Sequence, residues 1–323
     1  MTISDQPSDK TIAVLPFANR SSSEEIEYFS DGMTEGVINA LAKIEGLIVT
    51  SKTSSFYFKD KQLPSPEIGK KLGVSTLLEG SVQLSGDSMR ITAQLIDATE
   101  DFQFWSETWD RTIDHIFDVQ DEISLLIADQ LRERLGHFEI QDHLVEPNTQ
   151  SVDAYKLFLK GQQTFNKWNP EDVKQSMAYY EQALDIDPNL AEAMVGLADA
   201  YSFLASVEVI PFEEGWGKCA KLTQKALNIN NKLPGAYYQL ANMALFTKCS
   251  YREAFEHATK AVSLDPNHVE SQQFTAFLYS IAGKKMEAHE HLKQALSIDP
   301  LSQETLFYSG YIEYMSENFS EAL

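Results

Sequence analysis

Four related blocks determine how the second half of this chain folds: ALDIDP at 183–188, ALNINN at 226–231, AVSLDP at 261–266 and ALSIDP at 295–300. Their starting points lie 43, 35 and 34 residues apart. Each block closes a predicted helix, and three of them end in proline, which cannot continue a helical backbone ladder. A repeat of this length predicts an array of helix pairs that stack on one another.

Small and aromatic residues recur upstream of each block, where close packing between two helices requires them. They include Ala193, Leu197, Ala198 and Tyr201, then Ala236, Leu240 and Ala241, then Ala276, Tyr279 and Ala288. Over residues 151–323 this pattern resembles the 34-residue tetratricopeptide repeat and predicts about four and a half units. An insertion at 206–215 and Asn231 in place of the terminal proline depart from it. The fifth unit stops before its second helix is complete, so we interpret Leu323 as a break point within a longer protein.

The first half has a different periodicity, typical of short strands mixed with helices. Its β-rich runs are TIAVLPF (11–17), GLIVTS (46–51), STLLEGSVQL (75–84), MRITAQLID (89–97) and FQFWSETWD (102–110). Helical spacing appears at 32–44, 65–74 and 116–135, with Ser65 as a predicted cap. The turn at 85–87 predicts a hairpin that the next run extends into a meander. We therefore expect an α+β domain at 11–136, with a mixed sheet and flanking helices, between a flexible N-terminus at 1–10 and a linker at 137–150.

Several segments of this half carry a family resemblance. They are IAVLPFANRSSSEEIEYFSDGMTEGVINAL (12–41), TSKTSSFYFKDK (50–61), IGKKLGVSTLLEGSV (68–82), RITAQLIDA (90–98), FWSETWDR (104–111) and IFDVQDEI (116–123). Together they resemble the TolB-like N-terminal (FlgO-type) domain of bacterial regulatory proteins. The resemblance implies a larger chain, with a CadC-like or AraC-like DNA-binding domain or a nucleotide cyclase domain elsewhere.

Charge and cysteine content limit the partners and the compartment. The chain has 26 Lys and Arg against 48 Asp and Glu, a formal net charge of −22. Binding to a phosphate backbone needs clustered cations, so we expect no nucleic acid partner for these residues themselves. Cys219 and Cys249 are predicted to be free thiols in helices. The polar N-terminus and the absence of a long apolar run predict a cytoplasmic protein, or a periplasmic one if a membrane anchor precedes residue 1.

Two glycine-containing motifs in the first half allow a functional or a structural interpretation. Asp31-Gly32 is expected to open the first helix, where Asp31 either forms part of an anion site or caps the helix. Gly80 lies inside a strand pattern, so it marks either a ligand contact or a close structural neighbour.

The end of the third β run carries the remaining candidates. Alternation places Trp105 and Trp109 on one face, as core or interface residues or as a stacking platform. Asp110 and Arg111 are predicted to form a local ion pair. His289 and His291, two residues apart, do not share a helix face and so do not suggest a metal site. The sequence contains no recognisable catalytic constellation, so we predict no enzyme activity and no cofactor.

The repeat array offers a candidate binding surface, because the first helix of each unit lines the concave side of such arrays. The residues predicted there, in three successive units, are Tyr238, Gln239 and Asn242, then Gln273, Phe274 and Phe277, then Phe307, Tyr308 and Tyr311. Aromatic rings mixed with carboxamides suit an extended peptide or a sugar. The alternative is that several of these side chains pack between repeats.

Taken together, these patterns predict the non-enzymatic sensory and protein-interaction region of a larger bacterial transcriptional regulator. Its repeat surface would bind a peptide, a partner protein or a small ligand and relay that event to a DNA-binding domain. The alternatives are the regulatory half of a nucleotide cyclase or another signalling enzyme, and a free-standing assembly scaffold. Strand edges and the unfinished repeat also leave a homodimer open.

Overall fold

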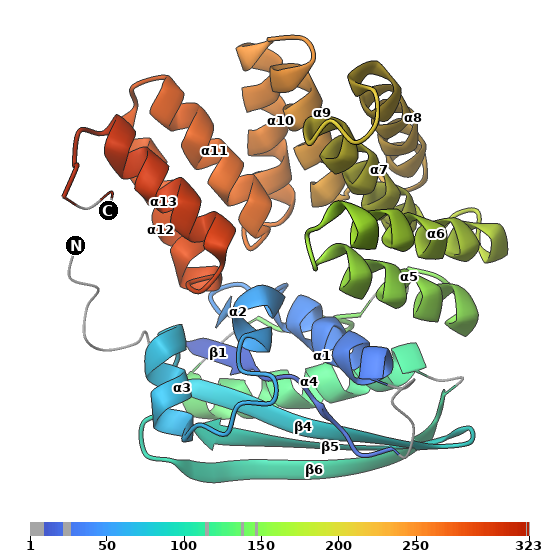
Figure 1. Ribbon diagram of the computed structural model, residues 1–323. Helices are drawn as coiled ribbons and strands as arrows, with labels where there is room; N and C mark the ends of the chain where they lie inside the picture. Colours follow the sequence, from blue (N-terminus) through green and yellow to red (C-terminus); the bar gives the residue numbers. More distant parts are fainter. Residues whose placement is uncertain are drawn as a thin grey trace. The chain divides into compact units, whose positions relative to one another are not determined.

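The computed structural model (Figure 1) describes residues 10–21, 27–113, 116–136, 139–145, 148–320 and 322. The internal packing divides the chain into two compact units. The first unit is Met1–Glu146 together with Lys285–Leu323, and the second is Pro147–Lys284. The predicted flexible N-terminus lies outside the described residues up to residue 9.

A mixed sheet forms the centre of the first unit. Its strands are β1 (Thr11–Val14), β2 (Ala18–Asn19), β3 (Ile48–Val49), β4 (Thr76–Ser85), β5 (Ser88–Asp97) and β6 (Phe102–Thr112). The order is β3-β1-β4-β5-β6, with β2 also paired to β4. Strand β1 runs parallel to β3 and β4, whereas β4, β5 and β6 are antiparallel. The predicted hairpin and meander are confirmed: Ser85 pairs with Ser88, and Gly86 between them takes a φ of 60°.

One face of β5 is buried and the other is polar. Met89, Ile91 and Leu95 are fully buried. Arg90, which points the other way, is exposed and pairs with Asp110 directly across on β6, with Nε 2.7 Å from Oδ1. The predicted ion pair between Asp110 and its neighbour is therefore wrong, because cross-strand residues on one face approach more closely than consecutive residues, which point to opposite faces.

The described residues of the first unit also form the helices α1 (Glu27–Leu41), α2 (Lys52–Phe56), α3 (Ser65–Leu72), α4 (Ile116–Leu135), α12 (Lys285–Ile298) and α13 (Gln303–Met315). Helices α1 and α4 pack together along one side of the sheet (Figure 1). The bounds predicted for the helix at 116–135 are confirmed. Residues 139–145 of the predicted linker pack on α4, where the Asp121 carboxylate accepts hydrogen bonds from the N–H groups of Leu144 and Val145. His137 and Pro147 of that segment lie outside the described residues.

The starts of two helices differ from the sequence prediction. Helix α1 is already formed at Glu27, so Asp31 lies inside it and neither caps the helix nor forms an N-terminal anion site. Instead, the Lys59 ammonium lies 2.6 and 2.9 Å from the two Asp31 carboxylate oxygens. Burial raises the pKa of Asp31 although Lys59 acts against that shift. In α3 the cap position belongs to Pro64, and Ser65 is the first helical residue.

The end of α12 is fixed to α2 by a buried carboxylate. Asp299 is 4% exposed and accepts hydrogen bonds from the Ser51 hydroxyl at 2.5 Å and the Ser54 hydroxyl at 2.6 Å. The N–H of Leu301 donates to the Ser54 oxygen at 2.9 Å, and the N–H of Ser51 donates to the carbonyl of Ile298 at 2.7 Å. These bonds join residues about 250 positions apart and place the last repeat block within the first unit.

The second unit is helical over its described residues, as the repeat pattern predicts. Its helices are α5 (Val152–Phe165), α6 (Pro170–Ile186), α7 (Ala191–Ser206), α8 (Phe212–Ile229), α9 (Pro234–Phe246), α10 (Tyr251–Leu264) and α11 (Val269–Ile281). They pack in succession as pairs, α5 with α6, α7 with α8 and α9 with α10. Consecutive first helices also touch: α5 meets α7, α7 meets α9, and α9 meets α11. We call α5, α7, α9 and α11 the inner layer and α6, α8 and α10 the outer layer.

Small residues allow these helices to approach closely. The Tyr180 ring lies between Gly161 on α5 and Gly196 on α7, where an added Cβ would lie 2.5 and 2.6 Å from ring atoms. The first alanine of each repeat block in this unit is fully buried: Ala183, Ala226 and Ala261. The small-residue positions read from the sequence are thus helix-packing positions.

Candidate functional site

The predicted binding residues fall in both units. Tyr238, Gln239 and Asn242 lie on α9, and Gln273 and Phe277 lie on α11, all in the inner layer of the second unit. Tyr308 and Tyr311 lie on α13, in the first unit. With Phe274, also on α11, the structure brings six of the nine predicted residues together on neighbouring helices, while Phe307 lies on α13 with the two tyrosines.

Gln239 takes part in a network between α7, α8 and α9. Its side chain is 3% exposed; its amide donates to the Asp199 carboxylate on α7, and its oxygen accepts from the Cys219 thiol at 3.5 Å. Burial raises the pKa of Asp199 to about 7, opposed by the Gln239 hydrogen bond and reinforced by the negative charge of Glu270. Burial likewise raises the pKa of Cys219 to about 12, so this thiol stays protonated.

An aromatic cluster occupies the contact between α9 and α11. The Phe274 ring lies edge-on to Tyr238 at 5.9 Å and stacks on Phe277 at 6.0 Å. Tyr238 also lies 6.2 Å from the His268 ring at the start of α11. Phe274 is buried, whereas Tyr238 and Phe277 remain half-buried.

The carboxamides beside this cluster are less accessible than the rings. Asn242 and Gln273 are buried, and the Asn242 amide donates to the backbone carbonyl of Tyr238 at 3.2 Å. Tyr238 and Phe277 thus present more surface than the buried amides do.

The two residues on α13 have a separate environment. The Tyr308 ring lies 5.8 Å from Phe307, which is largely exposed. Burial raises the pKa of Tyr308 to about 12. Tyr311 is half-buried. Both tyrosines lie on a helix whose sequence carries no Lys or Arg.

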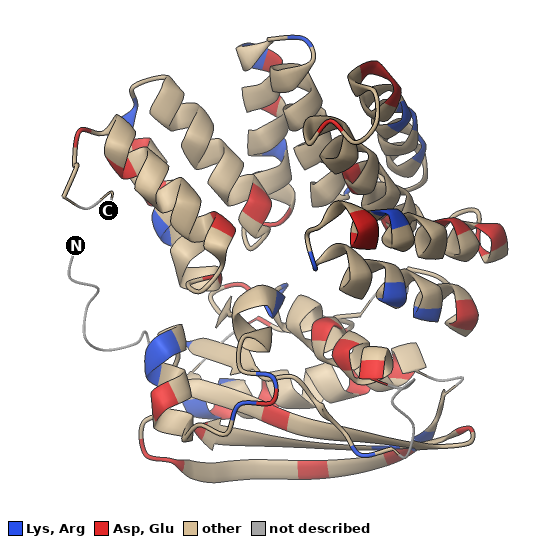
Figure 2. Cartoon of the chain, in the orientation of Figure 1, with Lys and Arg blue, Asp and Glu red and all other residues tan. Residues whose placement is uncertain are grey.

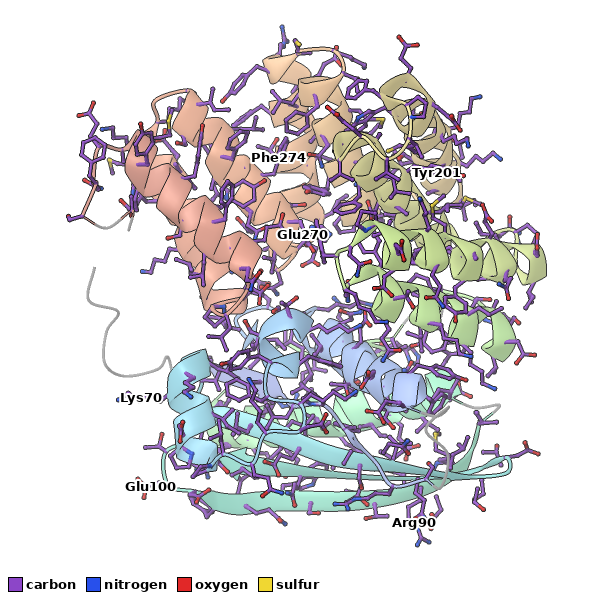
Figure 3. The ribbon with its side chains drawn as sticks, viewed as in Figure 1. Lys70, Arg90, Glu100, Tyr201, Glu270 and Phe274 are labelled. Carbon is purple, nitrogen blue, oxygen red and sulfur yellow. The ribbon has the colours of Figure 1, made fainter. Side chains whose placement is uncertain are left out.

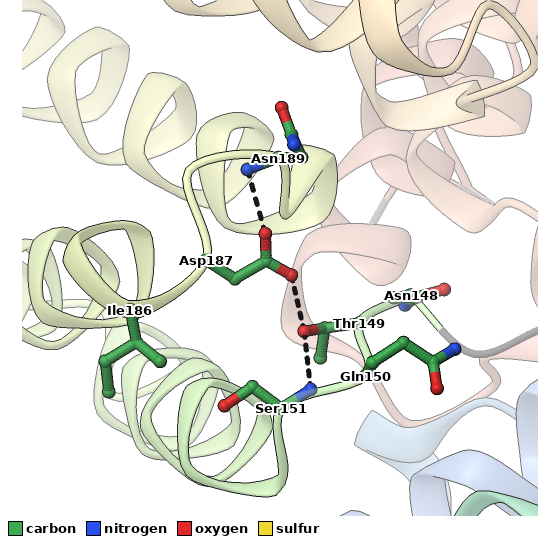
Figure 4. A pocket seen from close by; sticks show the side chains of 7 residues that line it. All are labelled: Asn148, Thr149, Gln150, Ser151, Ile186, Asp187 and Asn189. Atoms are coloured by element: carbon green, nitrogen blue, oxygen red, sulfur yellow. Dashed lines mark hydrogen bonds between the residues drawn. The ribbon is translucent and has the colours of Figure 1, made fainter.

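Figure 4 shows an open cleft of about 590 Å³ at the start of α5. It is lined by Asn148, Thr149, Gln150, Ser151, Ile186, Asp187 and Asn189. The Thr149 hydroxyl donates to Asp187 at 2.5 Å, and the backbone N–H of Asn189 donates to the other oxygen of that carboxylate at 3.0 Å. The carboxylate in this cleft therefore holds the α6–α7 turn and the segment before α5 together.

The remaining candidates have structural roles. A Cβ at Gly80 would lie 2.7 Å from the Phe17 ring, which confirms a close neighbour as the reason for this glycine. Trp105 and Trp109 lie on one face, as predicted, with ring centres 6.0 Å apart and Trp109 buried.

Both cysteines are free. Cys219 lies in α8, as predicted, whereas Cys249 lies in the turn after α9 with a φ of 52°, so the prediction of a helix is wrong there. Among the described residues, no group of three or more His, Cys, Asp or Glu side chains is arranged to hold a metal ion. Over the same part of the chain, no helix has the length and apolar character needed to cross a bilayer.

Two parts of the chain match protein-family models. Residues 8–126 match the second domain of HilA/YgeH-like transcriptional regulators, and residues 168–190 match a tetratricopeptide repeat. The first match covers the stretch that resembles a TolB-like domain in sequence, and that finer resemblance stays a prediction.

A curated relative in Rhizobium meliloti (strain 1021), named "Putative adenylate cyclase 3", is 32% identical over 243 residues. The match covers 73% of this chain and 40% of the relative's length.

Among solved structures, a thermophilic TPR protein of Thermus thermophilus is 17% identical with a TM-score of 0.43, covering 52% of this chain and 86% of that one. YrrB, a TPR protein with an unusual peptide-binding site, is 20% identical with a TM-score of 0.33, covering 53% and 81%.

Proposed function

We propose that this chain is the regulatory, protein-interaction region of a longer bacterial signalling protein. The match to the cyclase-named relative carries the proposal. A stretch of 243 residues is longer than either the α+β portion or the repeat portion, so it includes parts of both. The relative is also much longer than the matched stretch, which supports an effector domain outside this chain.

Two effectors have support. The family match of residues 8–126 supports a transcriptional regulator, and we propose that a DNA-binding domain, CadC-like or AraC-like, receives the signal there. The relative supports a nucleotide cyclase. With either effector, we propose that this chain lies on the input side, performs no catalysis itself and stays in the cytoplasm.

The inner layer of the second unit is the proposed input surface. Tyr238 and Phe277 are half-buried there and have the amphipathic or apolar rings that peptide-binding surfaces use. Asn242, Gln239 and Gln273 are buried on the same two helices, and the Asn242 amide donates to the Tyr238 backbone carbonyl. A peptide or a partner protein suits a surface spread over several helices better than a small ligand does, because small ligands favour enclosed pockets.

Tyr308 and Tyr311, on α13 of the first unit, remain proposed partner-binding residues of that unit. A homodimer through the long β6 edge is a further outcome that size measurements on the same samples would reveal.

The test uses the full-length native protein. ATP conversion to cyclic AMP and binding to duplex DNA are measured on it and on this chain alone. We expect one of the two activities in the full-length protein and neither in the chain alone. Tight, salt-sensitive DNA binding by the chain alone would contradict the role assigned to its acidic composition. Cyclase activity of the chain alone would contradict the non-enzymatic role.

A further inference from the structure

Strand β6 is an open edge of the sheet in the first unit. The strand order ends at β6, so within the described residues only one of its two sides is paired with a strand. It is 11 residues long, most of its side chains are exposed, and both acidic and basic residues occur along it (Figure 2). The backbone N–H and C=O groups on the outer side of such a strand can pair with a further strand.

The register with β5 shows which side chains of β6 share a face. Glu107, Trp109 and Arg111 all lie opposite fully buried residues of β5, so they belong to the core side of the sheet. Trp109 is 4% exposed, whereas Glu107 and Arg111 are exposed. The register is regular from Trp105 to Thr112, because the one irregularity lies before Trp105. An acid and a base therefore flank one tryptophan, each two residues away from it.

Ion pairs within the chain account for the other charges of this edge but not for Glu107. Arg90 on β5, which Figure 3 labels, pairs with Asp110 on the opposite face of the sheet. Arg111 lies 2.6 Å from the Glu122 carboxylate on α4, and both side chains are 40% exposed, so each can make a further contact. Glu107 makes no ion pair with any described residue. The edge thus presents one uncompensated acid and one accessible guanidinium on the same face.

Only one symmetric register of β6 against itself sets opposite charges across from each other. Two strands related by a two-fold axis pair antiparallel about a central residue, and side chains of one face meet side chains of that same face. With Trp109 at the centre, Glu107 faces the partner's Arg111 and Arg111 faces the partner's Glu107. Asp110 then faces the partner's Thr108, a neutral residue. A centre at Glu107 or at Asp110 would set two like charges against each other, and a centre at Thr108 would pair no opposite charges.

We propose that β6 pairs antiparallel with β6 of a second copy of this chain, with Trp109 at the two-fold axis and two Glu107–Arg111 pairs across the interface. The proposal rests on the homodimer of the proposed function and does not depend on which effector follows. Backbone hydrogen bonds along the edge hold the two strands together, and the charge pairs select the register. The same charges repel each other in the registers centred at Glu107 and Asp110, which limits unspecific pairing of exposed edges.

Helix α4 adds apolar area beside this edge. Leu125 and Leu126 lie three and four positions after Glu122, on the same side of the helix, and both are half-buried. Because Glu122 contacts Arg111 on β6, this side of α4 lies next to the strand. A second copy paired at β6 would bring its own α4 to the same face of the joined sheet and cover these leucines further.

Sedimentation equilibrium of this chain tests the pairing, because a dimer has twice the monomer mass of 36.4 kDa. We expect a reversible monomer–dimer equilibrium when the concentration is varied over a roughly hundredfold range. Arg111→Glu and Glu107→Arg each convert both complementary pairs into like-charge pairs. Each variant is expected to raise the dissociation constant of the dimer by roughly tenfold or more. Glu107→Arg also leaves the contact between Arg111 and Glu122 unchanged.

An equimolar mixture of the two variants is the decisive sample. In a mixed pair, one copy supplies only acids and the other only bases at positions 107 and 111, so both cross-strand pairs are complementary again. We expect mixed dimers whose dissociation constant lies within about threefold of the wild-type value. The matched control is Arg252→Glu on α10, an exposed site in the second unit with the same change of charge as Arg111→Glu. It should change the dissociation constant by less than about twofold.

A wild-type chain that stays monomeric over the whole range would overturn the proposal, as would a dimer that neither variant weakens or a mixture that does not associate. Net charge alone predicts the opposite effect for Glu107→Arg, since that change reduces the repulsion between two chains of charge −22. Circular dichroism shows whether each variant folds; if Arg111→Glu does not, Glu107→Gln should weaken the dimer less than Glu107→Arg does, and equal effects would overturn the pairing.

Failure of the pairing and failure of the proposed function give different results. A monomeric chain, with effector activity present in the full-length protein, would reject the β6 dimer and leave the proposed function standing. A dimer that follows the charge pattern, without effector activity in the full-length protein, would do the reverse.

Discussion

Replacing Asp299 by alanine tests the link between the last repeat block and the first unit. The carboxylate is 4% exposed and accepts hydrogen bonds from the Ser51 and Ser54 hydroxyls. A hydrogen bond to a charged group contributes about 1.5–3 kcal/mol, and the buried Ser54 hydroxyl would lose its carboxylate partner. Removing a buried charge recovers part of that loss. We therefore expect a net loss of about 3 kcal/mol in the free energy of unfolding of the first unit.

Urea titration followed by circular dichroism measures this loss. If the free energy of unfolding falls by about 2 kcal/mol per molar urea, the transition midpoint should move down by roughly 1.5 M. Hydrogen exchange should rise at residues 48–58 and 295–301.

Asp265→Ala is the matched control, because Asp265 holds the same place in the preceding block and accepts the N–H of Asn267, two residues away, at 2.8 Å. It should cost less than about 1 kcal/mol. Equal shifts in the two variants, or a loss below about 0.5 kcal/mol for Asp299→Ala, would refute the reasoning.

Three further predictions concern single sites. Gly80→Val should lower the melting temperature by several degrees, about 1–3 kcal/mol, because the new side chain would overlap the Phe17 ring; an unchanged melt would contradict the contact. Asp199 has a folded-state pKa raised to about 7, so stability should fall as pH rises from about 4 to 7, by roughly 4 kcal/mol; the slope should flatten in Asp199→Asn, and urea titrations at several pH values measure it. Lys59→Met should cost about 3 kcal/mol in the same titrations by leaving the Asp31 carboxylate buried without its cation, and a wild-type midpoint would show that the pair is dispensable.

Helix and strand positions could be read from the sequence where a periodic apolar pattern determines them. The block ending at Pro188 predicts the end of α6 because proline stops the helix, and alternation along β5 predicts its buried face. The start of α1 differs from the prediction although apolar spacing is present there: Phe29 lies one helical turn before Met33, and both are buried. The prediction follows Asp31-Gly32 as a helix opening, whereas this pair lies inside the helix and Asp31 is paired with Lys59.

Long-range hydrogen bonds are the part of the candidate surface that the sequence could not supply. The blocks that contain Asp265 and Asp299 share four of their six residues, yet Asp299 receives buried hydroxyl partners from residues about 250 positions away, while Asp265 accepts from a neighbour two residues on. In the same way, the carboxamide side chain of Gln239 suits a ligand contact, but its amide donates a hydrogen bond to Asp199, 40 residues earlier. The pattern of a single sequence does not show which distant residue supplies the hydrogen-bond partner of a buried polar side chain.

The native protein's intact mass tests the central claim most directly. The chain described by this sequence has a mass of 36.4 kDa. The account predicts that protein isolated from its source cells with an antibody against this chain has a substantially larger mass, and that its peptides include a cyclase or DNA-binding domain. A native mass of 36.4 kDa, with no additional peptides, would contradict the assignment of this chain as the input region of a longer signalling protein.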